Sequence, residues 1–414
     1  MSARVSPTLV ASPPTQRVRL PTGSRPLPGP DTLEHVLVCP IAQLIVAGRS
    51  GSALIHAYLD GHPEVLHIPH TFKFFDFVAA NPDLLALDAD TLSERFVESP
   101  LTPFLFDSAK SVIIGGRLGR QMNIYVEVDR RRFAEAFASL MRGASLTHRT
   151  VFCGLVAAFG WCVGQDPKRA KVLLHHLHHG DWLFPAVLIE RSNCPEGAPV
   201  DGLAMLRPTR IIQSLRNPYE AFQSIAGFSR RHQLPAAEVV KTQEKIVRLL
   251  AQDWFRWRLI QRVADWCHTV RLEDLRSNPL VVMRQCAKAI GIDPDAPALA
   301  DLTYYGWTWM GDIYTTPTPT IHASGDHGPI AWQDRAFLDE LLDAWVTDAG
   351  YTRSIAAAGS GALTKMSVLA PSPTLLNVGS SALERWRAAS STTRDRLRFA
   401  GRFSAAKRVA GLTA

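Results

Sequence analysis

The segment LIVAGRSGSALIHAYLDGHP at residues 44–63 joins an apolar run, a glycine-rich turn and a helical pattern in direct succession. The apolar run from Leu44 to Ala47 predicts a buried strand. Gly48 and Gly51 permit a tight turn after it. The residues that follow predict a helix that ends at about Asp60. A strand, a turn and a helix in this order favour an α/β fold with a parallel sheet.

The turn of this segment predicts an anion site. The first N–H groups of a helix have no partner within the helix, and the helix dipole favours negative charge there. Ser50 and Ser52 add hydroxyl donors and Arg49 adds a cation. The nucleoside-triphosphate loop is excluded because no Lys follows the second Gly, and the dinucleotide pattern G-x-G-x-x-G is absent. We expect a phosphate cradle here, and the alternative is a glycine-rich turn without a ligand.

A second segment, TRIIQSLRNPYEAFQSIAGFS at 209–229, has the same strand-to-helix order. Ile211 and Ile212 predict a buried parallel strand, and Pro218 favours the start of a helix. Arg216 then lies at the carboxyl end of the strand, where open α/β sheets bind ligands. Ser224 follows two helical turns later, on roughly the same side as the helix start. This pair can hold a second phosphate, although an Arg that only pairs at a strand end is the alternative.

A third segment, TVRLEDLRSNPLVVMRQCAKAIGI at 269–292, predicts scaffolding rather than catalysis. We expect a strand over 269–272, a turn at 273–275 and a helix over 279–290. Pro279 suits the first position of that helix and Gly291 suits its C-terminal cap.

Together the three segments resemble the motifs of sulfotransferases that use 3′-phosphoadenosine-5′-phosphosulfate (PAPS). They follow the order and spacing of that family, and WQDRAFLDELLDAWVTDAGY at 332–351 resembles its closing helix with a Gly-Tyr pair. The style of the motifs is closest to the tyrosyl-protein and carbohydrate branches. The resemblance implies a P-loop-like sulfotransferase fold, which is a three-layer α/β sandwich with a central, mostly parallel sheet. The stretch at about 71–170 matches none of these motifs, and its residues predict a helical insertion with helices over 131–142 and 146–163.

The resemblance implies that two phosphates of one donor are bound and that no metal is needed. The 5′-phosphosulfate would contact Gly48, Arg49, Ser50, Gly51, Ser52 and Ala53, and the 3′-phosphate would contact Arg216 and Ser224. Two residues depart from the family pattern. Ala53 stands where Thr is usual, and Leu272 replaces an aromatic residue common before Glu-Asp-Leu. Contacts to adenine are therefore expected elsewhere, and Trp332 is the candidate.

Sulfuryl transfer to a hydroxyl needs a base for the acceptor proton and a cation for the charge on the leaving phosphate. Arg49 is the candidate cation. In the tyrosyl-protein and carbohydrate branches a catalytic Glu lies eight residues after the His of the His-Pro pair. The same count from His62 reaches His70. An unperturbed imidazole titrates near neutral pH, so His70 is a candidate base.

The rival base lies in the run KVLLHHLHHGDW at 171–182. We expect a strand over 172–174 that ends in this run of histidines. Strand alternation places His176 and His178 on one face, where either can line the acceptor pocket. The alternatives are packing at the strand end or a metal site, and the run has no thiolate or carboxylate set beyond Asp181 to favour metal.

The positive charge of the chain lies at its ends. Of a net charge of +7, residues 1–30 carry four Arg and no acid, and residues 383–414 carry eight Lys or Arg against two acids. The rest is slightly negative, which argues against a nucleic-acid-binding body. We expect a disordered Pro-rich leader at 1–30, a sulfotransferase domain at 31–353, a linker at 354–382 and a basic helix or tail at 383–414. That tail is a candidate contact for a membrane surface or a protein.

The predicted reaction moves a sulfuryl group from PAPS to an acceptor hydroxyl, by in-line transfer with a His base. The acceptor is expected to be a carbohydrate, a glycolipid or a secondary metabolite, and the unmatched insertion would select it. The alternatives are a P-loop kinase, which predicts magnesium dependence, and a non-catalytic nucleotide-binding scaffold. The scattered cysteines and the lack of a signal-peptide or membrane-spanning pattern favour a cytoplasmic protein.

Overall fold

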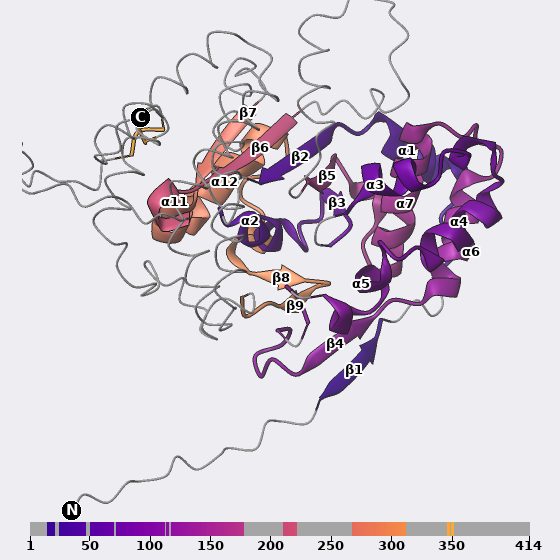
Figure 1. Cartoon of the computed structure of the whole chain (residues 1–414), viewed down its shortest axis with the longest axis horizontal. Coiled ribbons are helices and arrows are strands. Elements are labelled where there is room, and N and C mark those ends of the chain that lie inside the picture. The colour runs from indigo at the N-terminus through magenta and orange to yellow at the C-terminus, as the bar shows by residue number, and fades with distance from the viewer. Residues whose placement is uncertain are drawn as a thin grey trace, which may run out of the picture.

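The computed structural model describes residues 15–20, 25–46, 50–69, 72–111, 113–115, 117–177, 210–221, 267–311, 346–347 and 349–351. A five-stranded sheet forms the centre of this structure, and all neighbouring strands in it run parallel (Figure 1). The strand order is β3 (Val65–His67), β5 (Val172–Leu177), β2 (Ile41–Val46), β6 (Arg210–Leu215) and β7 (Cys267–Arg271). The strand before the glycine-rich turn, β2, is therefore the middle one. The predicted α/β class with a central parallel sheet is confirmed.

Alternate side chains of these strands enter two separate hydrophobic cores, one on each face of the sheet. The core that contains helices α2 (Ser52–Leu59) and α12 (Pro279–Ile290) includes the strand residues Ala42, Leu44, Leu174, Ile212 and Val270. The core that contains helices α1 (Pro30–Val38) and α7 (His148–Cys162) includes the strand residues Ile41, Ile45, Leu173, Leu177 and Ile211. Helices thus cover both faces of the sheet, which is the predicted three-layer arrangement.

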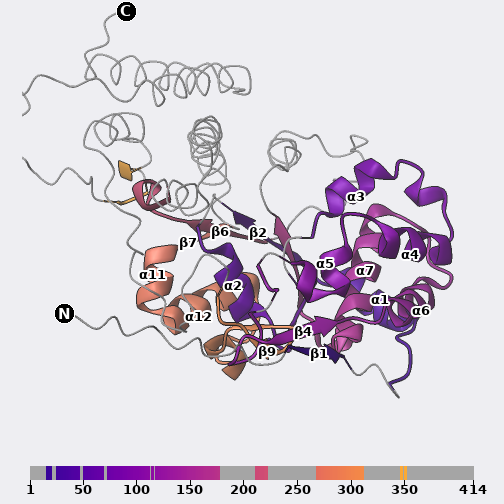
Figure 2. The same cartoon turned by 60° about the horizontal axis from the view of Figure 1, so that its bottom comes forward.

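The chain between β3 and β5 is mainly helical, as predicted for the insertion. Its α-helices are α3 (Phe74–Ala80), α4 (Ala89–Glu98), α5 (Pro103–Phe106), α6 (Arg130–Met141) and α7, and its short 3₁₀ turns are η1 (Leu84–Ala86), η2 (Ser108–Lys110) and η3 (Pro167–Arg169). Asp129 caps α6, and Thr147 with Thr150 forms a capping box at the start of α7. Figure 2 shows α1, α4, α6 and α7 gathered on one side of the molecule, away from α11 (Leu272–Ser277) and α12.

Part of the predicted disordered leader is ordered, so that prediction is wrong for residues 16–19. They form β1 (Gln16–Arg19), which pairs in parallel with β4 (Ile124–Glu127). The Arg17 guanidinium contacts the Glu127 carboxylate across this pair. β1 forms because β4 is a pairing partner that is distant in sequence. The four residues of β1 lie in a Pro-rich segment and carry no local signal strong enough to predict a strand.

The third motif segment differs from the prediction at its turn and agrees at its helix. The strand β7 ends at Arg271, and the Glu-Asp-Leu residues lie in the short helix α11 rather than in a turn. Helix α12 has the predicted bounds, with Pro279 at its start and Gly291 in the left-handed region at φ +83° as its cap. A 3₁₀ turn, η6 (Pro297–Ala300), and the hairpin of β8 (Thr303–Tyr304) with β9 (Trp307–Thr308) follow.

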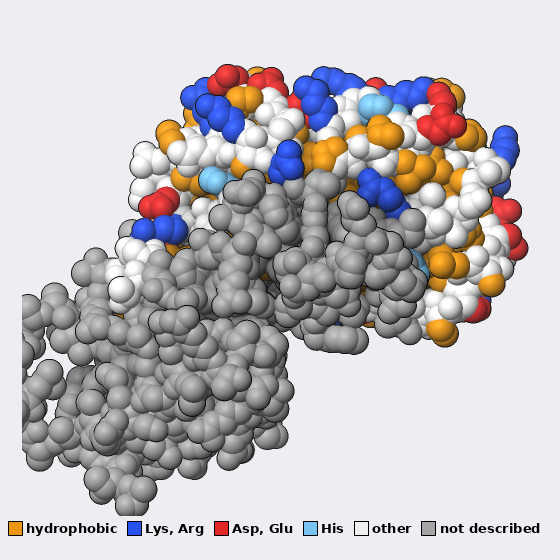
Figure 3. Space-filling view, turned by 90° about the horizontal axis from the view of Figure 1, so that it is seen from above, with side chains coloured by type: hydrophobic (Ala, Val, Ile, Leu, Met, Phe, Trp, Pro, Cys, Tyr) orange, Lys and Arg blue, Asp and Glu red, His pale blue; other side chains and the backbone are white. Residues whose placement is uncertain are grey.

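The described surface carries both signs of charge. Figure 3 shows Lys and Arg side chains interspersed with Asp and Glu on the described part of one face. None of the described helices is long and apolar enough to cross a membrane.

Candidate functional site

The glycine-rich turn joins the middle strand of the sheet to α2. Gly51 is the residue before the helix, and it adopts the left-handed conformation, with φ +86° and ψ +18°. No side chain caps this end of α2, so the first turn of the helix presents backbone N–H groups as the sequence predicts. Ser50 and Ser52 are both buried here. Gly48 and Arg49 lie outside the described residues.

Glycine is required at position 51 by its surroundings as well as by its φ. A Cβ atom built on Gly51 would lie 2.4 Å from Cδ1 of Leu272, the first residue of α11. Leu272 is itself buried, at 3% exposure. The turn of the first motif therefore packs directly on the third motif. The family resemblance predicts an aromatic residue at position 272, and the leucine found there packs against the turn at Gly51.

The turn also contacts the end of the neighbouring strand β6. The hydroxyls of Ser50 and Ser214 are hydrogen-bonded to each other, and the Ser214 hydroxyl also donates to the backbone oxygen of Ile45. Arg216 follows Ser214 by two residues, just beyond the carboxyl end of β6. The first and second motifs thus meet at the carboxyl edge of the sheet, which is where α/β sheets bind ligands.

Arg216 is a buried cation, with 4% of its surface exposed. Its guanidinium contacts the Glu220 carboxylate at 3.3 Å, and Arg276 of α11 lies 3.7 Å from the same carboxylate. Burial lowers the pKa of Arg216, and the positive charge of Arg276 lowers it further. The carboxylates of Glu220 and Glu273 act in the opposite direction and raise this pKa. Arg216 is thus a buried guanidinium at the carboxyl edge of the sheet, a group that can bind an anion.

Glu273 links the second motif to the end of the described chain. One carboxylate oxygen accepts a hydrogen bond of 2.9 Å from the backbone N–H of Asn217, and the other accepts one of 3.0 Å from the hydroxyl of Tyr351. The Tyr351 ring in turn lies under the Arg271 guanidinium, 4.2 Å from it. These contacts fit the scaffolding role that the sequence predicts for the third segment, because they fix the loop that carries Arg216.

The histidine run begins inside a strand rather than after it. β5 extends through Leu177, so His175 and His176 are strand residues that face opposite sides of the sheet. His175 packs among Phe72, Phe75 and Phe152, and its Nε2 lies 3.0 Å from the backbone oxygen of Phe72. Burial lowers the pKa of His175 to about 4, so this imidazole is neutral at neutral pH.

His176 lies on the other face, within a chain of buried polar side chains that was not predicted from the sequence. Nδ1 of His176 is 2.9 Å from Nδ1 of His56 on α2, and Nε2 of His56 is 2.9 Å from Nδ1 of His67 on β3. Nε2 of His67 is 3.3 Å from the Asp60 carboxylate at the end of α2. One signal could have indicated part of this chain, because His56 and Asp60 are four residues apart at the C-terminal end of α2.

Asp60 is ionised although it is buried. Burial alone raises the pKa of a carboxyl group, but the contacts of Asp60 with His67, Thr303 and Gly306 outweigh this effect and hold its pKa below the ordinary value. The backbone N–H of Gly306 also donates to the carboxylate, at 3.1 Å. The β8–β9 hairpin therefore helps to keep a negative charge at one end of the histidine chain.

The remaining predicted site residues divide between described and undescribed parts of the chain. Ala53 belongs to the first turn of α2, and its backbone oxygen accepts a hydrogen bond of 3.0 Å from the hydroxyl of Tyr304. The predicted residues that lie outside the described part are His70, His178, Ser224 and Trp332. Their roles stay predictions. Among the described residues, no three His, Cys, Asp or Glu side chains are arranged to hold a metal ion.

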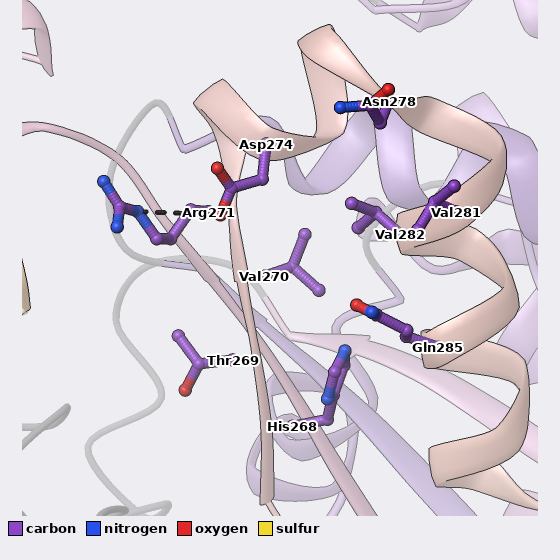
Figure 4. A pocket seen from close by; sticks show the side chains of 9 residues that line it. All are labelled: His268, Thr269, Val270, Arg271, Asp274, Asn278, Val281, Val282 and Gln285. Carbon is purple, nitrogen blue, oxygen red and sulfur yellow. Dashed lines mark ion pairs between the residues drawn. The ribbon is translucent and has the colours of Figure 1, made fainter.

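A separate pocket of about 270 Å³ lies between β7 and α12 (Figure 4). Its lining consists of His268, Thr269, Val270, Arg271, Asp274, Asn278, Val281, Val282 and Gln285. Arg271 forms an ion pair of 3.7 Å with Asp274, and in Figure 4 its guanidinium points away from the valines of α12. None of the residues predicted to bind the donor lines this pocket, so it is distinct from the candidate site.

Comparison with solved structures finds sulfotransferases. The chain is similar to the sulfotransferase domain from the Synechococcus PCC 7002 olefin synthase, with 17% identity, a TM-score of 0.32 and coverage of 69% of this chain and 81% of that one. The sulfotransferase domain from the curacin biosynthetic pathway is 13% identical with a TM-score of 0.39, and the match covers 76% of this chain and 99% of that one. Sulfotransferase STF9 from Mycobacterium avium is 14% identical with a TM-score of 0.35, and the match covers 78% of this chain and 80% of that one. At these identities and scores, the likenesses transfer no residue role to this chain.

Comparison of sequences finds no relative. No protein-family model matches the chain, and no curated protein matches it.

Proposed function

We propose that this chain is a sulfotransferase that moves a sulfuryl group from PAPS to an acceptor hydroxyl. The observation that supports this best is the meeting of three segments at the carboxyl edge of one parallel sheet. Gly51 packs on Leu272, Ser50 bonds to Ser214, and the loop after β6 is held by Glu273. Segments that are distant in sequence thus meet at one surface, and we propose that this surface binds the anionic donor.

The residues of this surface suit a donor with phosphates at both ends. The uncapped start of α2, with the Ser52 hydroxyl, suits the 5′-phosphosulfate, while the Ser50 hydroxyl donates to Ser214. Arg216 suits the 3′-phosphate, because it is a buried cation on the adjacent strand end. Arg49 and Ser224 are the further predicted contacts. The donor supplies an activated sulfuryl group on a phosphate leaving group.

In the proposed reaction the acceptor hydroxyl oxygen attacks the sulfur. A new S–O bond forms to the acceptor, the S–O bond to the phosphate breaks, and its electron pair stays on the phosphate oxygen. The acceptor proton passes to a histidine, for which His70, His176 and His178 are the candidates. Cationic and N–H groups at the start of α2 stabilise the charge on the leaving phosphate. The acceptor is proposed to be a glycan, a glycolipid or a small metabolite rather than a nucleic acid.

Ligand-dependent thermal unfolding tests the donor site and separates the proposal from a P-loop kinase. We expect 3′,5′-bisphosphoadenosine to raise the melting temperature without magnesium, since a ligand at 100 times its Kd adds about 2.7 kcal/mol of stability. Arg216→Ala should lose most of this shift. Arg284→Ala is the matched control, because Arg284 is an arginine of α12 that pairs with Asp295 at 3.1 Å. Stabilisation by ATP with magnesium alone would favour the kinase.

Turnover separates an enzyme from a non-catalytic scaffold. The full chain would be incubated with PAPS and a native metabolite extract, and products would be detected by the mass added by one sulfuryl group. Release of bisphosphoadenosine together with a sulfated product supports the enzyme. Tight binding of bisphosphoadenosine with no product from any extract favours the scaffold.

A further inference from the structure

The chain Asp60–His67–His56–His176 crosses from the end of α2 to β5 through two intervening imidazoles. All four side chains are at most 3% exposed, so they are shielded from solvent. Each contact needs one N–H, and a neutral imidazole has only one. The placement of a single proton therefore determines the placement of the others.

The carboxylate of Asp60 decides the direction of these bonds. Nε2 of His67 lies 3.3 Å from this anion, and a lone pair there would be repelled by the carboxylate, so a neutral His67 carries its proton on Nε2 and accepts at Nδ1. Nε2 of His56 then donates to His67, and Nδ1 of His56 accepts. Nδ1 of His176 consequently donates to His56, which leaves the lone pair of His176 on Nε2. Any group that contacts this nitrogen must donate to it, as an acceptor hydroxyl does.

We propose that Asp60, His67 and His56 are positioning residues that hold His176 in the proton-accepting tautomer, and that His176 is the base of the reaction. This inference builds on the proposed sulfotransferase function and selects one base among its three candidates. His176 is the penultimate residue of β5, at the carboxyl edge of the sheet that also carries Arg216.

The same chain accounts for the proton after transfer. When Nε2 of His176 takes the proton of the acceptor hydroxyl, its Nδ1 proton can pass to His56. The Nε2 proton of His56 then passes to His67, so the positive charge moves next to Asp60. No proton is created or lost, and the charge of the protonated chain is balanced by the Asp60 carboxylate.

The groups around the chain support this polarity. Among the described residues, Gly306 donates its N–H to Asp60, and the Tyr304 ring lies 5.5 Å from the His56 ring with its hydroxyl directed to the backbone of Ala53. Tyr305 is buried near Asp60, and its phenol stays protonated because burial and that carboxylate raise its pKa. Asp60 contacts this chain of side chains at His67.

Nuclear magnetic resonance of histidine-labelled protein tests the tautomers without any activity. The full chain would be labelled with ¹⁵N at histidine, and resonances would be assigned by His56→Gln, His67→Gln and His176→Gln. We expect N–H on Nε2 of His56 and His67 and on Nδ1 of His176 at neutral pH. An N–H on Nε2 of His176 would overturn the proposal. This result stands whether or not the protein transfers sulfuryl groups.

Asp60→Asn tests the effect on turnover. Without the carboxylate, the protonated chain loses its counter-charge, so kcat should fall about 10- to 1,000-fold while the KM for PAPS stays the same. The acid limb of the pH profile should move to lower pH by about 1 to 3 units, because a nearby anion raises the pKa of an imidazole.

His62→Gln is the matched control. His62 is also a fully buried histidine beside Asp60, but its bonds go to the backbone of Asp293 and Glu64. If Asp60→Asn and His62→Gln lower kcat equally and neither moves the acid limb of the pH profile, Asp60 has only a structural role and the proposal is wrong. Loss of activity only in His70→Ala would assign the base to His70. If the wild-type protein transfers no sulfuryl group, the proposed function fails. The tautomer measurement still tests the arrangement of Asp60, His67, His56 and His176.

Discussion

The substitution Gly51→Ala tests how the turn of the first motif is built. At φ +86° a residue with a Cβ costs about 1–2 kcal/mol more than glycine. The new Cβ would also stand 2.4 Å from Cδ1 and 3.3 Å from Cγ of Leu272. Because Leu272 is buried, its side chain has little room to move, and such overpacking costs about 1–3 kcal/mol. We expect the variant to lose about 2–5 kcal/mol of unfolding free energy.

The second substitution, Leu272→Ala, separates the strain from the clash. Alone it should cost about 2–5 kcal/mol, because it leaves a cavity under the turn. In the double variant the new Cβ of residue 51 meets no leucine, so only the strain of the positive φ remains. Urea unfolding of the four proteins should therefore show a double variant about 1–3 kcal/mol more stable than the sum of the single effects predicts. Additivity within about 0.5 kcal/mol would refute the contact between these segments.

Three further predictions concern other contacts of the site. Ser214→Ala removes the partner of the buried serine in the turn, so the unfolding free energy should fall by about 1–3 kcal/mol and bisphosphoadenosine should bind more weakly in calorimetry. Glu273→Gln should destabilise the protein more than Tyr351→Phe does, because Glu273 accepts two of these hydrogen bonds and Tyr351 donates one; equal losses in urea unfolding would contradict this. His175 has a folded pKa of about 4 against 6.5 unfolded, so its stabilising effect is lost as pH falls from about 6.5 to 4. His175→Phe should therefore gain up to about 3 kcal/mol relative to wild type between pH 7 and pH 4 in urea unfolding, and no relative gain would contradict the buried neutral imidazole.

The elements with local signals could be predicted from the sequence. Pro279 and Gly291 mark the two ends of α12 because both positions have strict conformational preferences, and the structure has those ends. The strand and helix on either side of the glycine-rich turn were also correct, since their apolar patterns are continuous. Arg216 was placed at a strand end for the same reason, and it lies there.

The features that depend on distant partners could not be predicted. The strand at 16–19 forms because it pairs with Ile124–Glu127, and the sequence of residues 16–19 does not predict that partner. The tight contact that excludes a side chain at Gly51 comes from Leu272, more than two hundred residues away in sequence. Likewise His56, His67 and His176 belong to three different elements, and only the packing of α2 on the sheet brings their rings together. Strand alternation predicts His176 as a candidate site residue, but it does not predict the partners on α2 and β3.

The most direct test of the proposed function is a single transfer measurement with purified protein and PAPS. Mass spectrometry would follow both products, bisphosphoadenosine and the sulfated acceptor, in a metabolite extract without added magnesium. The proposed function predicts that both appear in equal amounts, and that Arg216→Ala reduces both together. Formation of neither product, with a phosphorylated acceptor when ATP and magnesium are supplied instead, would contradict it.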